Sequence, residues 1–214
     1  MQRNDPLSQA KALLYEHFGY SSFRGAQETL ISAILSGKDA LGIMPTGAGK
    51  SICYQIPGLM LPGITLVVSP LISLMQDQVR ALKAAGIAGA YLNSSLSYKQ
   101  YLKALDNARK GMYKIIYVAP ERLVTGEFQS FAASVPISLV AVDEAHCVSQ
   151  WGHDFRPSYM NIAPFVAMLP TRPVLAAFTA TATPAVREDI LCHLKLQNPE
   201  IAVTGCNREN LFFR

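Results

Sequence analysis

The chain is poor in cysteine, and its four cysteines are widely spaced. No two of them form the CxxC pair that is typical of structural zinc sites, so we expect no zinc in this fragment. Scattered cysteines of this kind indicate free thiols in a reducing compartment rather than a disulfide framework. The four positions are Cys53, Cys147, Cys192 and Cys206.

The sequence also lacks a long apolar segment. The first ten residues, MQRNDPLSQA, are polar and do not contain the apolar stretch of a signal peptide. No apolar run approaches the roughly 18 residues that a membrane-spanning helix needs. We therefore expect a cytoplasmic protein without a membrane partner.

Charge is scarce as well, since only 16% of the residues are charged and the formal net charge is +4. With 214 residues, half of them hydrophobic, the chain is long and apolar enough for one large globular domain or a tight pair. The small positive surplus is compatible with binding a polyanion but does not establish it.

Short apolar runs recur along the chain, and the stronger ones do not alternate between apolar and polar residues. A strand without alternation is covered on both faces, as in a parallel sheet flanked by helices. Helices are predicted between the runs, over 71–85 from a 3.6-residue period, over 97–110 from the capping box of Ser97 and Gln100, and after Thr183 and Pro184. This alternation predicts a doubly wound α/β domain. The predicted strands lie in 40–45, 64–70, 89–93, 114–120, 137–144 and 173–180.

Ligands of such sheets bind beyond the carboxyl ends of the strands. The segment MPTGAGKS, residues 44–51, follows a strand and precedes a helix, which is the context of a phosphate-binding P-loop. Gly47 and Gly49 would let N–H groups turn toward phosphates, Lys50 would reach the β- and γ-phosphates, and the Ser51 hydroxyl would bind Mg²⁺. Met44 stands where the strict pattern has glycine, so a glycine-rich turn without a ligand is the alternative. The predicted phosphate-binding residues are Thr46, Gly47, Ala48, Gly49, Lys50 and Ser51.

Two acids, Asp143 and Glu144, end another predicted strand. An acid at this place can lie beside a P-loop and hold Mg²⁺, and the second acid can orient or deprotonate an attacking water. We predict these roles for Asp143 and Glu144 respectively, and count both with Lys50 as catalytic residues. The alternative is a solvated acidic turn.

GAGKS together with DEAH resembles the DExH-type helicases, whose motor consists of two RecA-like P-loop NTPase domains. Five further segments resemble motifs of the RecQ family of ATP-dependent DNA helicases and follow one another in that family's order. They are FGYSSFRGAQ (18–27), VVSPLISLMQDQV (67–79), YVAPERL (117–123), SQWGHDFRPSY (149–159) and FTATAT (178–183).

The resemblance implies a RecA-like first motor domain over 1–206, with N-terminal helices in 1–36 that carry an adenine-reading motif. Residues 207–214 would begin the connection to a second RecA-like domain. The implied activity is ATP-driven 3′–5′ unwinding in DNA repair and recombination, with ATP and Mg²⁺ as cofactors. Single-stranded and partly duplex DNA would be the partner, at the nucleoid if the source is bacterial. Without the second domain and its arginine finger, which is worth about 10³–10⁵ in rate in related NTPases, we expect the fragment to hydrolyse ATP poorly and to unwind nothing.

In the adenine-reading motif, Tyr20 would stack on the base, Arg24 would pack near it, and the Gln27 amide would bind its N6/N7 edge, to which it offers one donor and one acceptor. The 149–159 segment supplies rings and cations, the two kinds of group that bind bases and phosphates of single-stranded DNA. Aromatic residues are also common in cores, and Phe155 is the one best suited to burial. The predicted DNA-binding or coupling residues are Ser69, His146, Gln150, Trp151, His153, Phe155, Arg156, Thr179 and Thr181.

Two other functions stay open at this point. A DEAH-type RNA helicase would share the P-loop and the acids, although the 18–27 and 149–159 segments argue against it. A non-enzymatic, nucleotide-gated DNA-binding module would share the sites without the turnover.

Overall fold

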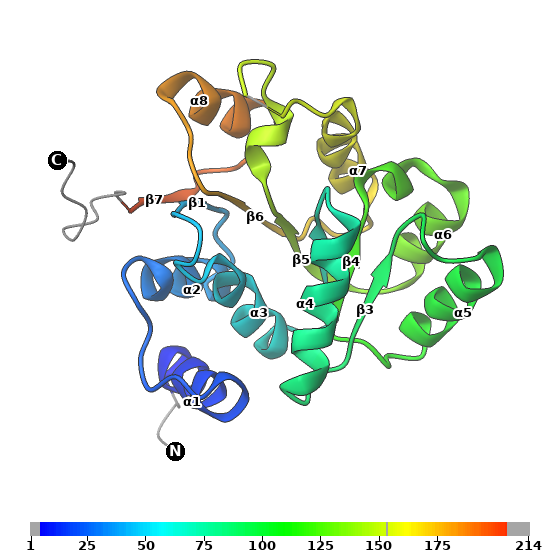
Figure 1. The fold of residues 1–214 in the computed structure, drawn as a ribbon, viewed down its shortest axis with the longest axis horizontal. Helices are drawn as coiled ribbons and strands as arrows, with labels where there is room; N and C mark the ends of the chain where they lie inside the picture. The colour runs from blue at the N-terminus through cyan, green and yellow to red at the C-terminus, as the bar shows by residue number, and fades with distance from the viewer. Residues whose placement is uncertain (1–4, 153, 205–214) are drawn as a thin grey trace, which may run out of the picture.

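The computed structural model describes residues 5–152 and 154–204, which form a seven-stranded sheet between two layers of helices (Figure 1). The strand order is β3-β4-β2-β5-β6-β1-β7, and each neighbouring pair is parallel. This arrangement confirms the predicted parallel α/β sheet.

Six of the seven strands coincide with the predicted runs, whereas β7 was not predicted. The strand β7 lies at an edge of the sheet, pairs with β1, and is only half-buried, so it lacks the continuous apolar run that marks the inner strands. The strands are β1 (Ala40–Ile43), β2 (Ile64–Val68), β3 (Gly89–Leu92), β4 (Ile115–Val118), β5 (Ile137–Val142), β6 (Val174–Thr179) and β7 (Glu200–Val203).

The predicted helix starts are present. The Ser97 hydroxyl accepts from the N–H of Gln100 in a complete capping box, and the Thr183 hydroxyl accepts from the N–H of Val186. The helices are α1 (Pro6–Phe18), α2 (Gln27–Leu35), α3 (Lys50–Met60), α4 (Ile72–Ala84), α5 (Tyr98–Arg109), α6 (Gly126–Ser134), α7 (Ile162–Met168) and α8 (Pro184–His193). Short 3₁₀ segments are η1 (Pro120–Val124), η2 (Ala145–Val148) and η3 (Pro157–Asn161). In the part of the chain that the structure describes, no helix has the length and apolarity needed to cross a membrane.

Each face of the sheet carries its own apolar core. Helices α2, α3 and α4 pack on one face, where Tyr54 and Val79 meet Val67 of β2. Helices α5 to α8 pack on the other face. There Phe128 and Phe165 share a core with Leu66, which directly precedes Val67 in β2. Successive strand residues therefore enter opposite cores, which explains why the inner strands are mostly apolar and do not alternate. Helix α1 packs against α2 and α3 outside the first layer (Figure 1).

Because all strands are parallel, the segments that follow them gather at one edge of the sheet. The strand β6 lies between β1 and β5 in the sheet, so the segments after β1 and β5 are separated by a single strand. This edge therefore receives both the glycine-rich segment 44–49 and the acidic segment that begins at residue 143.

Candidate nucleotide site and nucleic-acid interface

Residues 44–49 form a tight loop between β1 and α3. Gly47 and Gly49 have φ angles of 84° and 76°, in the left-handed region that favours glycine. Lys50 begins α3, and its Nζ donates a hydrogen bond of 3.1 Å back across the loop to the carbonyl of Met44. The loop thus has the curled backbone and the inward lysine amine that a phosphate cradle requires.

The side chain of Met44 explains why the first glycine of the strict P-loop pattern is dispensable here. It is 1% exposed and packs in the core under the loop, with its sulfur 4.0 Å from Sγ of Cys53. A side chain at this position therefore enters the core and leaves the curled segment 46–49 unobstructed.

The amide of Gln27 is bound to the loop itself. Its Nε2 donates to the carbonyls of Ala48 and Gly49 at 3.1 and 3.2 Å, and its Oε1 accepts from the N–H of Arg24 at 2.9 Å. Gln27 is only 5% exposed. An adenine that bound this amide would have to replace these contacts, so adenine reading by Gln27 stays a prediction.

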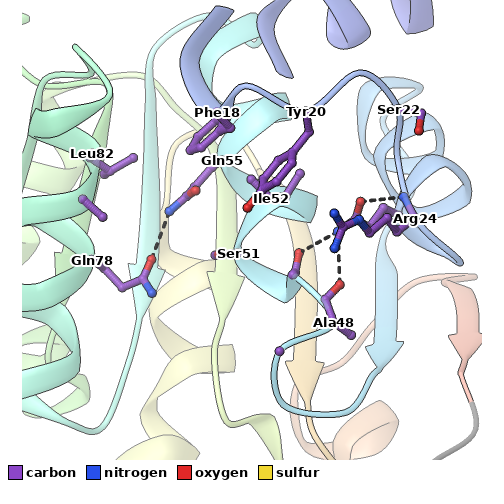
Figure 2. A pocket seen from close by; sticks show the side chains of 14 residues that line it. Phe18, Tyr20, Ser22, Arg24, Ala48, Ser51, Ile52, Gln55, Gln78 and Leu82 are labelled. Carbon is purple, nitrogen blue, oxygen red and sulfur yellow. Dashed lines mark hydrogen bonds between the residues drawn. The ribbon is translucent and has the colours of Figure 1, made fainter. Parts of the chain in front are cut away.

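A pocket of about 260 Å³ opens beside Gln27 and the loop. Tyr20, Arg24 and Ser51 line it together (Figure 2), and the guanidinium carbon of Arg24 lies 5.2 Å from the centre of the Tyr20 ring. These residues were predicted to bind nucleotide, and the fold brings them to one cavity.

The opposite side of the pocket consists of residues that sequence reasoning missed. Phe18 opens the 18–27 motif but was given no role, while Gln78 and Leu82 come from α4. Gln55 lies one helical turn after Ser51 and donates to Oε1 of Gln78 at 3.1 Å (Figure 2). The four-residue spacing from Ser51 could have identified Gln55, because such residues share a helix face. No sequence signal connects α4 to this pocket, since that contact depends on packing alone.

Replacing Gly49 with alanine is expected to destabilise the protein more than replacing Gly47. Each substitution carries the left-handed backbone cost of about 1–2 kcal/mol. Only at Gly49 would the added Cβ lie 2.4 Å from Nε2 of Gln27, whereas nothing lies within 4 Å of a Cβ at Gly47. The displaced amide would lose its hydrogen bonds to the loop, which adds about 1–3 kcal/mol.

Urea unfolding of the two variants measures this difference. The control repeats both substitutions in a Gln27→Ala background, where the excess cost at Gly49 should vanish. An unchanged excess in that background would show that the contact with Gln27 is not its cause.

The acidic pair lies at the carboxyl end of β5. Asp143 is 8% exposed, and burial together with the neighbouring charge of Glu144 raises the pKa of its carboxyl from 3.8 to about 6, while Lys50 acts in the opposite direction. Glu144 has a φ of 48°, and its N–H donates to Oδ1 of Asp143 at 3.1 Å. The buried hydroxyl of Tyr159, which was not predicted, donates to the carbonyl of Asp143 at 2.8 Å. The strained turn is thus held in place from both sides.

The strand β6, which lies between β1 and β5, contacts both the loop at 44–49 and the acidic segment through Thr179. Its carbonyl accepts from the N–H of Met44 at 2.9 Å, and its hydroxyl lies 2.9 Å from Nδ1 of His146. That hydroxyl donates its single hydrogen to the carbonyl of Thr181 at 3.1 Å, so it accepts from His146. Nδ1 of His146 also lies 3.3 Å from Oε2 of Glu144. One buried threonine therefore connects the P-loop with the acidic segment.

The segment after η2 carries the exposed aromatic residue of the site. Trp151 is 80% exposed and lies with His146 and Thr181 on a groove of about 330 Å³. The backbone N–H of Trp151 donates to the hydroxyl of Ser149, which in turn donates to Oδ2 of Asp189 on α8 at 2.7 Å. A large ring held in solvent on an anchored turn is available for stacking. Gln150 is exposed, Phe155 is half-buried, and His153 lies outside the described residues.

Arg156 is bound within the protein. Its Nη1 donates to the carbonyl of Pro70 at 3.1 Å, and its Nε and Nη2 both donate to Oδ2 of Asp154. These hydrogen bonds hold the pKa of Asp154 below its ordinary value. The guanidinium thus connects the aromatic segment to the turn after β2 and keeps part of its surface in solvent.

The position of Ser69 argues against its predicted contact with DNA. It is 1% exposed, and its hydroxyl has no hydrogen-bond partner among the described residues. The serine directly follows the fully buried strand β2, and its N–H donates to the carbonyl of Val118 on the neighbouring strand β4. The residues exposed at this turn are Leu71 and Ile72 instead.

A family model described as DEAD/DEAH box helicase matches residues 24–190. The chain belongs to the DEAD/DEAH box helicase family. The matched region contains the P-loop, the acidic pair and the aromatic segment, and it begins after Tyr20.

Curated relatives of the chain carry the name ATP-dependent DNA helicase RecQ. The protein of Bacillus subtilis is 50% identical over 209 residues, which are 97% of this chain and 35% of the relative. The protein of Pasteurella multocida is 49% identical over 207 residues, or 96% of this chain and 33% of the relative. The expected resemblance to the RecQ family is confirmed. The chain spans about a third of the length of these relatives.

Among solved structures, a hypothetical ATP-dependent RNA helicase from Sulfolobus tokodaii is similar with a TM-score of 0.68. The similarity covers 93% of this chain and 57% of that chain at 23% sequence identity. At this identity the likeness concerns the fold, and it confirms the predicted RecA-like architecture.

Proposed function

We propose that this chain is the ATP-binding motor domain of a DNA helicase that couples ATP hydrolysis to 3′–5′ movement along single-stranded DNA and to duplex unwinding in repair and recombination. The observation that carries the proposal is the 50% identity over 97% of the chain to a protein named ATP-dependent DNA helicase RecQ. The names of the curated relatives favour DNA over RNA.

The nucleotide would lie in the pocket beside the P-loop. Tyr20 stacks on the adenine with Arg24 against it, and Gln27 exchanges its loop contacts for the base edge. The exposed ring of Tyr20 and the guanidinium beside it support this placement. Residues 46–51 hold the phosphates, with Lys50 on the β- and γ-phosphates.

A helicase domain of this kind uses ATP with a divalent metal, which we propose to be Mg²⁺ held by Ser51 and Asp143. Mg²⁺ would offset the charge of the polyphosphate and of the acids. The donors suit it, because Mg²⁺ prefers oxygen ligands and the carboxyl of Asp143 is buried beside a second acid. Glu144 orients the attacking water and takes its proton.

Single-stranded DNA would contact the aromatic segment, with Trp151 stacking on a base and Arg156 facing the phosphates. Occupancy of this segment would reach the acids through His146 and Thr179, whose hydrogen bond supports a short route between the two sites. The residues proposed for DNA binding or coupling are His146, Gln150, Trp151, His153, Phe155, Arg156, Thr179 and Thr181.

The organisation of the parent protein is part of the same proposal. Residues 1–206 form the first RecA-like domain, with the helices in 1–36 carrying the adenine motif, and 207–214 lead to a second RecA-like domain. That second domain supplies an arginine to the bound triphosphate.

Replacing Trp151 with alanine is expected to reduce the stimulation of ATP turnover by single-stranded DNA about tenfold or more, and to leave turnover without DNA within about twofold. The reason is that loss of one stacking ring costs about 1–3 kcal/mol of DNA binding, whereas Trp151 lies on the groove with His146 and Thr181, and the pocket beside the P-loop is lined by other residues. Turnover is measured in the protein that carries both motor domains, with single-stranded DNA and with RNA of the same sequence.

The matched control is Tyr15→Ala, which removes an aromatic residue of similar exposure from α1. Equal loss of basal and stimulated turnover would make Trp151 a packing residue. Stronger stimulation by RNA than by DNA would overturn the choice of nucleic acid.

A further inference from the structure

The described part of the chain contains a second group of metal-type ligands, made of His146, Cys147 and Asp154. The ligand atoms of the three side chains all lie within 4.8 Å of one another. Sγ of Cys147 is 3.9 Å from Nε2 of His146 and 3.8 Å from Oδ2 of Asp154. The group contains one sulfur, one imidazole nitrogen and one carboxylate oxygen.

These separations are close to those of a tetrahedral zinc site. Zinc lies about 2.3 Å from a thiolate sulfur and about 2.0–2.2 Å from nitrogen and oxygen, so the sulfur would be about 3.5 Å from either neighbouring ligand atom. The observed 3.8 and 3.9 Å would need to shorten by a few tenths of an ångström. Rotation of the partly exposed side chain of Asp154 can supply part of that movement.

The hydrogen bonds of His146 orient its ring for such a role. The hydroxyl of Thr179 accepts from Nδ1, which places the ring hydrogen on Nδ1 and the lone pair on Nε2, the atom that faces Cys147. Oε2 of Glu144 lies 3.3 Å from the same Nδ1. Metal-binding histidines typically donate their other nitrogen to a carboxylate or a similar acceptor, which fixes the tautomer.

We propose that His146, Cys147 and Asp154 form a binding site for a divalent cation of the zinc class, with water from the solvent-exposed side as the fourth ligand. Binding breaks the S–H bond of Cys147, forms the metal–sulfur bond and releases the proton to solvent. A mixed sulfur, nitrogen and oxygen set selects Zn²⁺, Co²⁺ or Cd²⁺ over Mg²⁺, which prefers oxygen alone.

The cation would connect His146 and Cys147 of η2 with Asp154, which is now held by Arg156. Oδ2 of Asp154 is the oxygen on which Nε and Nη2 of Arg156 converge, so a cation on Oδ2 competes with this ion pair. The site therefore goes beyond the proposed helicase activity and does not depend on it, because it needs neither ATP nor DNA.

Titration with Co²⁺ tests the site, because a thiolate ligand produces a charge-transfer absorption band that oxygen ligands do not. The chain carries Cys192→Ser and Cys206→Ser, so that only Cys53 and Cys147 remain. We expect one Co²⁺ per chain with the thiolate band, its loss in Cys147→Ser, its retention in Cys53→Ser, and release of the Co²⁺ by Zn²⁺. Asp154→Asn should weaken Co²⁺ binding at least tenfold.

Several outcomes would overturn the proposal. They are absence of the thiolate band, its loss on Cys53→Ser with retention on Cys147→Ser, unchanged affinity in Asp154→Asn, or displacement of the Co²⁺ by excess Mg²⁺. Because Cys147 is buried, circular dichroism checks the folding of its variant, and the half-exposed Asp154 provides the deciding variant if Cys147→Ser does not fold.

Discussion

Replacing Lys50 with alanine is expected to lower ATP turnover by about 10²–10³-fold or more, the effect of removing one charged donor from a developing phosphate charge. The lysine amine lies over the loop, 3.1 Å from the carbonyl of Met44, where it can exchange this contact for phosphate oxygens. No other lysine belongs to the segment 44–51. The measurement is single-turnover ATP hydrolysis, with and without single-stranded DNA, in the protein that carries both motor domains.

The matched control is Lys103→Ala, which removes an exposed lysine from α5 and should leave turnover within about twofold. Lys50→Arg separates charge from shape, because arginine keeps the charge but presents a planar fork in place of a compact ammonium group. Turnover in Lys50→Ala within a few-fold of the parent would exclude the P-loop as the site of hydrolysis. A cellular role that persists without ATP turnover would favour a nucleotide-gated DNA-binding module.

Replacing Asp143 with asparagine is expected to stabilise the fold at neutral and alkaline pH while it abolishes hydrolysis. Burial raises the pKa of this carboxyl from 3.8 to about 6. A difference of roughly two pKa units corresponds to about 3 kcal/mol, which the folded protein loses when the buried group ionises. Because the asparagine side chain remains neutral, the Asp143→Asn variant would avoid this loss.

The sign follows from the direction of the shift. A carboxyl whose pKa is raised by folding favours the folded state below about pH 4, and this contribution disappears as the pH rises through about 6. The stability advantage of Asp143→Asn should therefore be largest near pH 8 and should close toward pH 4, as measured by urea unfolding.

Two comparisons separate this effect from a general loss of charge. Asp106→Asn removes an exposed acid of α5 that pairs with Lys110, the residue after that helix, and it should change the free energy of unfolding by less than about 1 kcal/mol. Mg²⁺ with nucleotide should reduce the advantage of Asp143→Asn, because the cation stabilises the ionised carboxylate. An advantage that is independent of pH would show that ionisation of Asp143 is not its source.

Much of the fold could be predicted because the inner strands are buried on both faces. The runs around β2, β4 and β5 are mostly apolar and do not alternate, which is typical of a strand covered by helices on both sides. The start of α5 could also be predicted, because its signal is local: the capping box of Ser97 and Gln100 involves residues three positions apart. The edge strand β7 was missed because a half-buried strand of four residues carries little apolar signal.

The residues of the candidate site also fall into those that a local pattern predicts and those that depend on tertiary packing. The loop at 44–51 and the acids at 143 and 144 were identified because each is a short contiguous pattern with its own chemistry. Burial of Ser69 could not be read from a motif, because it depends on how distant parts of the chain pack around the end of β2. The contacts of Gln27 with the loop likewise depend on how α2 packs beside α3.

The sequence by itself determined the parallel α/β fold, the tight glycine-rich loop at 44–49, the position of the acidic pair and the resemblance to the RecQ family, because these depend on residues adjacent in the chain. Only the tertiary structure decided which distant groups meet. It brought Gln55 and Gln78 to one pocket, and it turned Asp154 back onto Cys147. Side-chain encounters of this kind depend on packing and on the path of the backbone through a turn, neither of which a spacing pattern records.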